Sequence, residues 1–211
     1  MERLGNRGLE GSRAARQLVR RPSTAEVDRY LKKWERLENY VAQERSLKRL
    51  FEKTYPLNNS LEEVLVKVCV LNDLYSTNVY SAYNVASHIV GLNVDVKLKK
   101  GEFEVVNEIA GVRVGGNRSR NFYSFATKYC SHHVPKVFPI YDNYVGRMLR
   151  YFGARDRFCD FGNADLRDYP MFRAIVISFK DFYGLGRYSF KEIDRYLWLA
   201  GKGYFGKGRP K

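Results

Sequence analysis

The chain has 211 residues, of which 45% are apolar and 15% aromatic, so it can bury a core, and a wholly disordered protein is excluded. No apolar run approaches the roughly 18 residues of a membrane helix, and the N-terminus lacks the apolar stretch of a signal peptide. We therefore expect an intracellular, cytoplasmic protein without a membrane partner. The cysteines Cys69, Cys130 and Cys159 are odd in number and form no C-x-x-C pair, which argues against a disulfide framework.

The formal net charge is +14, and it is spread over three parts of the chain. Residues 1–22 contribute +4 and are interpreted as a flexible basic N-terminal arm. Residues 202–211 contribute another +4 as a basic C-terminal tail, which leaves +6 on the domain at 23–201. This distribution favours a polyanionic partner, nucleic acid first, and leaves the oligomeric state open.

The first half of the domain is expected to be helical. A capping box of Ser23 and Glu26 begins a long amphipathic helix that reaches about residue 53 with a break, until "YPLNNS" interrupts it. Ser60 begins a second helix, and a third continues from Val79 to Gly91. The alternation in "NVDVKLKKGEFEVV" fits a strand, but a lone strand has no partner, so we expect a loop and a short helix ending near Gly111.

The second half continues the same pattern. "GGN" at 115–117 is a turn signal, and a helix is expected from about 118 to 131. Further helices are expected from Asp142 to Phe152, ended by Gly153, and from Pro170, which suits a first turn. A last helix follows Ser189 and is closed by Gly201. The total is about eight helices with no convincing sheet, which predicts an all-α fold.

The stretch "FATKYCSHHVPKVFPIYDNYVGRML" carries the densest group of reactive side chains. Cys130, His132 and His133 offer zinc-type ligands, but adjacent histidines project in different directions and no second ligand pair follows. Cys130 and His132 are two residues apart, and residues so spaced do not face each other on a helix, which weakens a cysteine–histidine nucleophilic pair. We expect neither a metal site nor a cofactor.

Asp142 allows two interpretations. It begins a helix, so it can be an N-cap that accepts backbone N–H groups. The same position keeps the carboxylate ionised, because a helix N-terminus stabilises negative charge. A fixed carboxylate beside a pocket can stabilise a developing cation or orient a water, as cleavage of a glycosidic bond requires.

The order of these elements resembles the helix-hairpin-helix DNA glycosylase superfamily. A glycine-rich hairpin, "EIAGVRVGGNRSR", leads to the helix "NFYSFATKYC", and a proline-marked connection then leads to "FPIYD". The family's catalytic aspartate often stands in a Pro-x-x-Asp context, and Pro139 to Asp142 matches it over a resemblance that spans about residues 108–150. The resemblance implies a catalytic role for Asp142 and a base-excision activity on DNA.

The hairpin departs from the family's Leu-Pro-Gly-Val-Gly. It reads Ile109-Ala110-Gly111-Val112 followed by Arg113, or else Gly115 and Gly116 supply the turn. Glycines allow backbone N–H groups to approach a phosphate. The expected DNA-binding residues, against the alternative of a plain solvated loop, are Arg113, Gly115, Gly116, Asn117, Arg118 and Arg120.

Bifunctional members of the family carry a lysine nucleophile about twenty residues before the aspartate. Phe122 occupies that position here, and Lys128 is six residues further along the helix, about 9 Å by the rise of an α-helix. Lys128 is thus expected to lie too far along, as an ordinary surface lysine, and to act as a nucleophile only if the helix is displaced. The expected enzyme is monofunctional, with Asp142 positioning a water.

A flipped base needs aromatic faces and polar groups around it. The segment 74–84 offers them, with Asn84 at its end, and the expected base pocket is formed by Tyr75, Asn78, Tyr80 and Tyr83, although such tyrosines are also common packing residues. The leading hypothesis is a duplex-DNA-binding protein of DNA repair that resembles a hydrolase of the glycosylase type. The alternatives are a noncatalytic nucleic-acid-binding module on the same fold, and an interaction protein whose charge is incidental.

Overall fold

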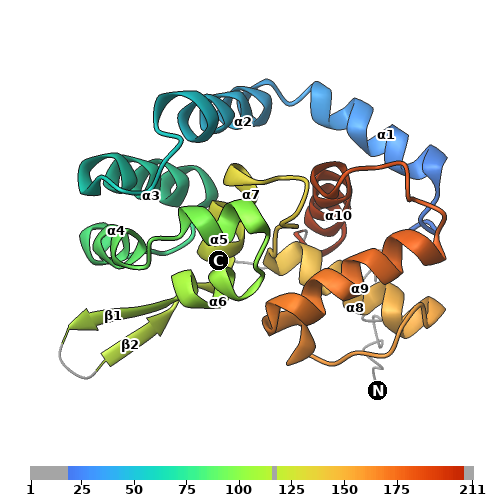
Figure 1. The fold of residues 1–211 in the computed structure, drawn as a ribbon. Coiled ribbons are helices and arrows are strands. Elements are labelled where there is room, and N and C mark those ends of the chain that lie inside the picture. The colour runs from blue at the N-terminus through green and yellow to red at the C-terminus, as the bar shows by residue number, and fades with distance from the viewer. Residues whose placement is uncertain (1–18, 116–117, 207–211) are drawn as a thin grey trace, which may run out of the picture.

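The computed structural model describes residues 19–115 and 118–206. Most of the predicted N-terminal arm, the last five residues of the tail, and Gly116 and Asn117 of the hairpin lie outside these ranges. The described residues form ten α-helices and one two-stranded sheet (Figure 1). The helices are α1 (Thr24–Glu35), α2 (Glu38–Arg49), α3 (Leu61–Tyr75), α4 (Ala82–Gly91), α5 (Asp95–Lys100), α6 (Glu104–Ala110), α7 (Tyr123–His133), α8 (Asn143–Asp156), α9 (Tyr169–Phe182) and α10 (Phe190–Phe205), and the strands are β1 (Gly111–Gly115) and β2 (Arg118–Asn121). The predominantly helical prediction is confirmed at this level.

The long first helix, which was predicted to contain a break, is divided into two helices, α1 and α2. Ser23 caps α1 as expected, because its hydroxyl accepts the N–H of Glu26 at 3.2 Å. The chain breaks at Arg36 and Leu37, and α2 then continues into a π-helical turn, η1 (Leu50–Thr54). This break, and the division of residues 95–110 into α5 and α6 where part was expected as loop, raise the predicted eight helices to ten.

The loops before and after α3 are fixed in different ways. The amine of Lys67 on α3 is fully buried and donates to the carbonyls of Tyr55 and Leu57 and to the side chain of Asn58. Burial lowers the pKa of Lys67 to about 8. After α3, Ser76 and Asn78 adopt positive φ, so residues 76–81 form a loop and α4 begins at Ala82, not at Val79 as predicted.

The region between α6 and α7 corrects the all-helical prediction. Residues 118–121 were expected to start a helix, but they form β2, which pairs antiparallel with β1 in the register Val112 to Arg120. The connection between α6 and α7 therefore contains two antiparallel strands. A two-stranded ribbon on its own is only marginally stable, and this one is anchored at its base, where Val112 is buried.

The C-terminal helices run further than their glycines indicated. Gly153 lies inside α8, which ends at Asp156, and Gly201 lies inside α10, which ends at Phe205. At Gly201 a Cβ atom would approach the Cβ of Tyr144 to 2.8 Å, so this glycine permits α10 to pack closely on α8. The segment 202–205, predicted as tail, is therefore helical.

The helices are arranged on two sides of α7. Figure 1 shows α3–α6 and the hairpin on one side and α8–α10 on the other, with α1 and α2 crossing above them. On one side α3 packs on α4 and α6 packs on α7, while on the other α10 packs on both α8 and α1. Nearly every residue of α7 is buried, including polar ones such as Thr127 and Lys128. None of the helices in the described part of the chain is long and apolar enough to cross a bilayer.

Candidate active site

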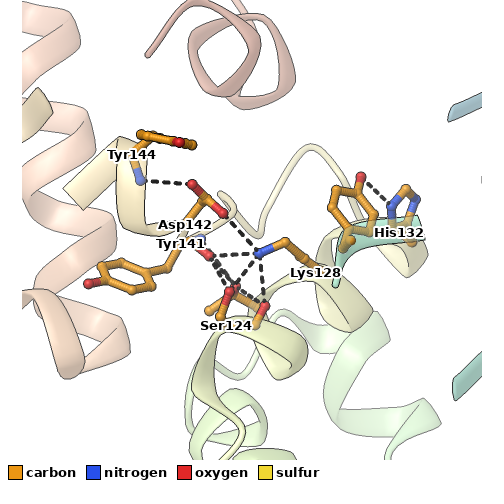
Figure 2. Close-up of polar contacts among 8 residues, drawn as sticks. Ser124, Lys128, His132, Tyr141, Asp142 and Tyr144 are labelled. Carbon is orange, nitrogen blue, oxygen red and sulfur yellow. Dashed lines mark hydrogen bonds and ion pairs between the residues drawn. The ribbon is translucent and has the colours of Figure 1, made fainter. Parts of the chain in front are cut away.

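The site begins with an ion pair between α7 and the start of α8. The amine of Lys128 lies 3.8 Å from the carboxylate of Asp142, and the lysine side chain is only 2% exposed. The amine also donates to the hydroxyl of Ser124 at 2.7 Å, and to the backbone carbonyl oxygens of Ser124 at 3.3 Å and Tyr141 at 3.1 Å (Figure 2). Four oxygen atoms thus surround the buried amine.

This position contradicts the expectation that Lys128 lies on the surface and too far along its helix. The chain between α7 and α8 folds back along α7, and Thr127 fixes its return. The hydroxyl of Thr127 accepts the N–H of Tyr141 at 3.1 Å. Asp142, the next residue, therefore lies level with Lys128, which a residue count along a straight helix does not reveal.

Burial is the main cause of a lowered pKa for Lys128, and the carboxylates of Asp142 and Asp194 oppose that shift. A lysine becomes a nucleophile only as the neutral amine, so a lowered pKa makes the reactive form more accessible. The arrangement of a desolvated amine beside a carboxylate is one that active sites use.

Asp142 is both an N-cap and a site residue. One carboxylate oxygen accepts the N–H of Tyr144 at 2.8 Å, and the other faces Lys128 (Figure 2). The side chain remains 23% exposed and lines a cavity of about 230 Å³. The two interpretations of this residue are therefore compatible, because its cap bond fixes a carboxylate that opens onto the cavity.

The cavity lies where α1, α2, α3, α8 and α10 meet. Its lining combines aromatic rings with charged and polar groups, namely Trp34, Tyr40, Gln43, Glu44, Leu47, Leu74, Tyr75, Ser76, Asp142, Lys191, Asp194 and Trp198. Its volume is below the range of roughly 300–1,000 Å³ that is typical for drug-sized ligands. A cavity of this size suits one small planar group.

Three aromatic residues form one wall. Trp34 and Trp198, the two tryptophans of the chain, have ring centroids 6.1 Å apart, and Tyr40 lies 5.7 Å from Trp34 and 5.2 Å from Trp198. The indole N–H of Trp34 is buried and finds no acceptor among the residues that the structure describes. Such a donor costs stability when it is unpaired, so this wall is suited to a ligand with a flat ring and a hydrogen-bond acceptor.

Charged side chains from α2 and α10 interact at another part of the cavity. The two carboxylate oxygens of Glu44 pair with Lys191 at 3.3 Å and with Arg195 at 2.6 Å. Burial raises the pKa of Asp194 to about 6, although Lys191 and Lys128 act in the opposite direction. The cavity thus contains carboxylates with different environments, which is one way that proteins separate acid and base roles.

The predicted base-pocket residues are not brought together. Tyr75 lines the cavity, and its hydroxyl bonds to the imidazole of His132 at 3.0 Å. Asn78 and Tyr80 line a second pocket that also includes Arg120, and Tyr83, with Asn84, lines a third beside Arg113. The four residues are therefore divided among three pockets, and only Tyr75 lies in the same cavity as Asp142.

The predicted DNA-binding arginines stand on the hairpin. Arg113, Arg118 and Arg120 are all exposed. Arg118 and Arg120 are two residues apart on β2 and share one face of the ribbon, whereas Arg113 is paired with Ser119. The positive charge is therefore presented on both faces of an exposed ribbon, with the backbone of Gly115 at the end of β1.

Cys130, His132 and His133 belong to the core of α7. Cys130 is fully buried, and His133 contacts the side-chain oxygen of Asn58 at 3.1 Å. Burial raises the pKa of the Cys130 thiol and lowers that of His133 to about 3. Within the described residues no group of three or more histidine, cysteine or acidic side chains is placed to hold a metal ion.

Sequence reasoning missed Trp34, Trp198, Glu44, Lys191 and Asp194. One signal was present, because Lys191 stands in the first turn of a helix, where a cation opposes the helix dipole. A residue that conflicts with its local environment often marks a functional position. The tryptophans gave no such signal, since both fit the apolar face of their helices.

Comparisons with known proteins place the chain in a family. The HI_0787_N family model, described as an N-terminal domain, matches residues 26–137, a range that includes Lys128 and ends before Asp142. An uncharacterized protein of Haemophilus influenzae is 45% identical over 150 residues, which cover 71% of each chain. No solved structure matches this chain. The protein therefore belongs to the HI_0787_N family.

Proposed function

We propose that the protein is a DNA N-glycosylase that receives one extruded base in the 230 Å³ cavity and cleaves its bond to the sugar beside Asp142. The observation that carries the proposal is the pair of Asp142 and Lys128. A carboxylate that is fixed by a helix N-terminus opens onto the cavity, and a desolvated amine lies 3.8 Å behind it.

The chemistry follows from the charges of the reaction. As the C1′–N bond breaks, its electron pair leaves with the base and positive charge develops on the sugar. The carboxylate of Asp142 stabilises that charge. The neutral amine of Lys128 then forms a bond to C1′ and loses a proton to solvent. The C1′–O4′ bond breaks as O4′ gains a proton and the nitrogen loses its second one, and the resulting imine links the enzyme to the opened sugar.

Two features support a DNA substrate. The net charge of +14 and the exposed arginines of the hairpin suit a phosphate backbone. Enzymes that act on a base must take it out of the stack, and they hold it between aromatic or apolar side chains. The wall of Trp34, Tyr40 and Trp198 offers such a surface.

A monofunctional reaction is a second candidate. The amine of Lys128 is held by three oxygen atoms of Ser124 and Tyr141, and it must leave them to attack C1′. If it stays in place, Asp142 orients a water instead, and Lys128 acts as the fixed counter-charge. The two versions differ in one product, the covalent imine.

The test uses purified protein and duplexes that carry uracil, an alkylated base or an oxidised base. We expect release of at least one of these bases, and Asp142→Asn is expected to slow release by about 100-fold or more. Borohydride reduction of the reaction with an abasic duplex traps the imine if Lys128 is the nucleophile, and Lys128→Gln then abolishes the adduct. Base release without an adduct indicates the monofunctional version.

A noncatalytic binding module on the same fold gives a different result. It binds duplexes in a salt-dependent way, releases no base from any of them, and forms no adduct. Base release that is unaffected by Asp142→Asn contradicts the assigned role of this carboxylate.

A further inference from the structure

The cleavage of an N-glycosidic bond creates two charges. The pair of Asp142 and Lys128 stabilises only the positive charge on the sugar. Positive charge develops on the sugar, and the electron pair of the broken bond moves onto the departing base. A cation near the base lowers the energy of that transition state when it is in place beforehand. The question is which side chain of the cavity supplies it.

We propose that Lys191, on α10, is the residue that contacts the departing base and stabilises its negative charge. This assignment rests on the proposed glycosylase function. Among the described residues that line the cavity with Asp142, Lys191 is the one cationic side chain. Its side chain is 19% exposed, whereas Lys128 is almost completely covered.

The position of Lys191 is unfavourable for folding alone. It lies in the first turn of the 16-residue α10, where the N-terminal end of the helix already carries a partial positive charge. Glu44 compensates from α2, and Arg195 holds the other oxygen of Glu44 at 2.6 Å. The ammonium group of Lys191 and the helix terminus are therefore the positive charges at this end of the cavity, beside the carboxylate of Glu44.

The charge state of Lys191 agrees with this role. Burial by itself lowers its pKa, but Tyr75, Asp194 and Glu44 more than offset this effect and raise the pKa overall. Lys191 therefore remains an ammonium ion at neutral pH, while the environment of Lys128 shifts that amine towards its neutral form. One lysine is suited to attack the sugar and the other to receive charge on the base.

The electrons balance in a simple way. The C1′–N bond breaks and its electron pair goes to the base, which leaves as an anion that Lys191 hydrogen-bonds. The bond to C1′ is completed by the nitrogen of Lys128 or by a water, and solvent later protonates the released base. Lys191 itself forms no covalent bond and keeps its proton.

The experiment measures single-turnover base release by Lys191→Met, with Lys99→Met, an exposed lysine on α5, as the charge-matched control. For a neutral base such as uracil, we expect Lys191→Met to be about 100-fold slower than the wild-type protein. Binding of a duplex with a tetrahydrofuran abasic analogue should be unchanged, because that ligand has no base. Lys99→Met should release base at the wild-type rate.

A charged leaving group gives the decisive comparison. The ring of 7-methylguanine carries a positive charge, so this base leaves as a neutral molecule and gains little from Lys191. An equal loss of rate for neutral and cationic bases, unchanged release by Lys191→Met, or a wild-type protein that releases only cationic bases overturns the assignment. A wild-type protein that releases no base overturns the proposed function itself, which separates the two failures.

Discussion

The cavity and the β-hairpin both present polar side chains, but they hold them differently. At the cavity, Asp142 contacts two other residues and Glu44 contacts two, and Lys128, buried behind Asp142, contacts three. On the hairpin, the arginines stand exposed on a two-stranded ribbon. Fixed groups suit a reaction whose transition state needs charges already in place, whereas exposed cations suit contact with a phosphate backbone.

This difference predicts that the two regions govern different measurements. Substitutions in the cavity should change the rate of the chemical step and leave duplex affinity nearly unchanged. Substitutions on the hairpin should change the affinity for duplex DNA and its salt dependence. They should leave the rate of base release from the bound duplex nearly unchanged.

The largest effect is expected from replacing Arg113, Arg118 and Arg120 together by serine. If each contacts a phosphate, the slope of log K against log salt falls by about 2.7, and the Kd for duplex DNA rises about 10- to 100-fold at roughly 100 mM salt. A fluorescence anisotropy titration at several salt concentrations measures both quantities. Replacing the exposed cations Lys32, Lys33 and Arg36 by serine is the matched control, and an equal loss of affinity there would show that only total charge matters.

The next effect concerns the packing that positions the cavity. At Gly201, a new Cβ would lie 2.8 Å from the Cβ of Tyr144 and 3.0 Å from its carbonyl oxygen. Gly201→Ala should therefore separate α10 from α8 and lower the free energy of unfolding by about 1–3 kcal/mol. Urea denaturation measures this loss.

Gly203 provides the control on the same helix. A Cβ there meets no atom within 4 Å. Because alanine favours a helix over glycine by about 1 kcal/mol, Gly203→Ala should leave stability unchanged or raise it. Similar destabilisation by both substitutions would indicate that helix propensity, not the close contact with Tyr144, determines the effect.

The histidines behind the cavity predict a pH effect on stability. Burial lowers the pKa of His132 well below its usual value, and it lowers that of His133 to about 3. The unfolded chain therefore binds more protons than the folded protein below about pH 6.5, so stability is present above that pH and falls as the pH decreases towards 3. The expected loss is about 1.4 kcal/mol per pH unit for each histidine.

Thermal denaturation between pH 7 and pH 4 measures this slope. His133→Gln should reduce the slope of the unfolding free energy against pH by the contribution of one histidine, about 1.4 kcal/mol per pH unit. A stability that is constant from pH 7 to pH 5 would contradict the burial of neutral imidazoles beneath the cavity.

The smallest effect is expected for the stability of Asp142→Asn. Asparagine is also a good N-cap, and Lys128 keeps its three other oxygen acceptors. We expect a change of at most about 1 kcal/mol in the free energy of unfolding, against a large loss of base release. Unfolding of this variant under assay conditions would mean that the ion pair is mainly structural.

Much of the fold follows from local signals in the sequence. The cap residues Ser23, Ser60, Asp142 and Ser189 all begin helices, because each side chain accepts a backbone N–H of the first turn. The helix ends predicted at Gly153 and Gly201 were wrong, because both glycines lie inside their helices. A glycine in a helical pattern either ends a helix or permits another element to approach, and only the contact of Gly201 with Tyr144 distinguishes these cases.

The hairpin shows a second limit of local reasoning. Residues 118–121 carry no strong strand pattern, and they become a strand because β1 supplies the partner to which their backbone groups bond. The exposed tyrosines of the 76–84 segment show a third. Tyr80, in the loop that the positive φ angles of Ser76 and Asn78 shape, is 86% exposed, and Tyr83 is 60% exposed although its helix, α4, packs on α3.

The sequence alone determined a mainly helical, basic protein and identified Asp142 as an N-cap carboxylate at the start of a helix, because caps and amphipathic periods act over a few residues. The tertiary structure decided what surrounds that carboxylate. Lys128 reaches Asp142 because the connection between α7 and α8 folds back, and Lys191 and the two tryptophans join them because α1 and α10 pack together although their sequences lie far apart. Contacts of that range depend on how whole helices pack, which no local pattern encodes.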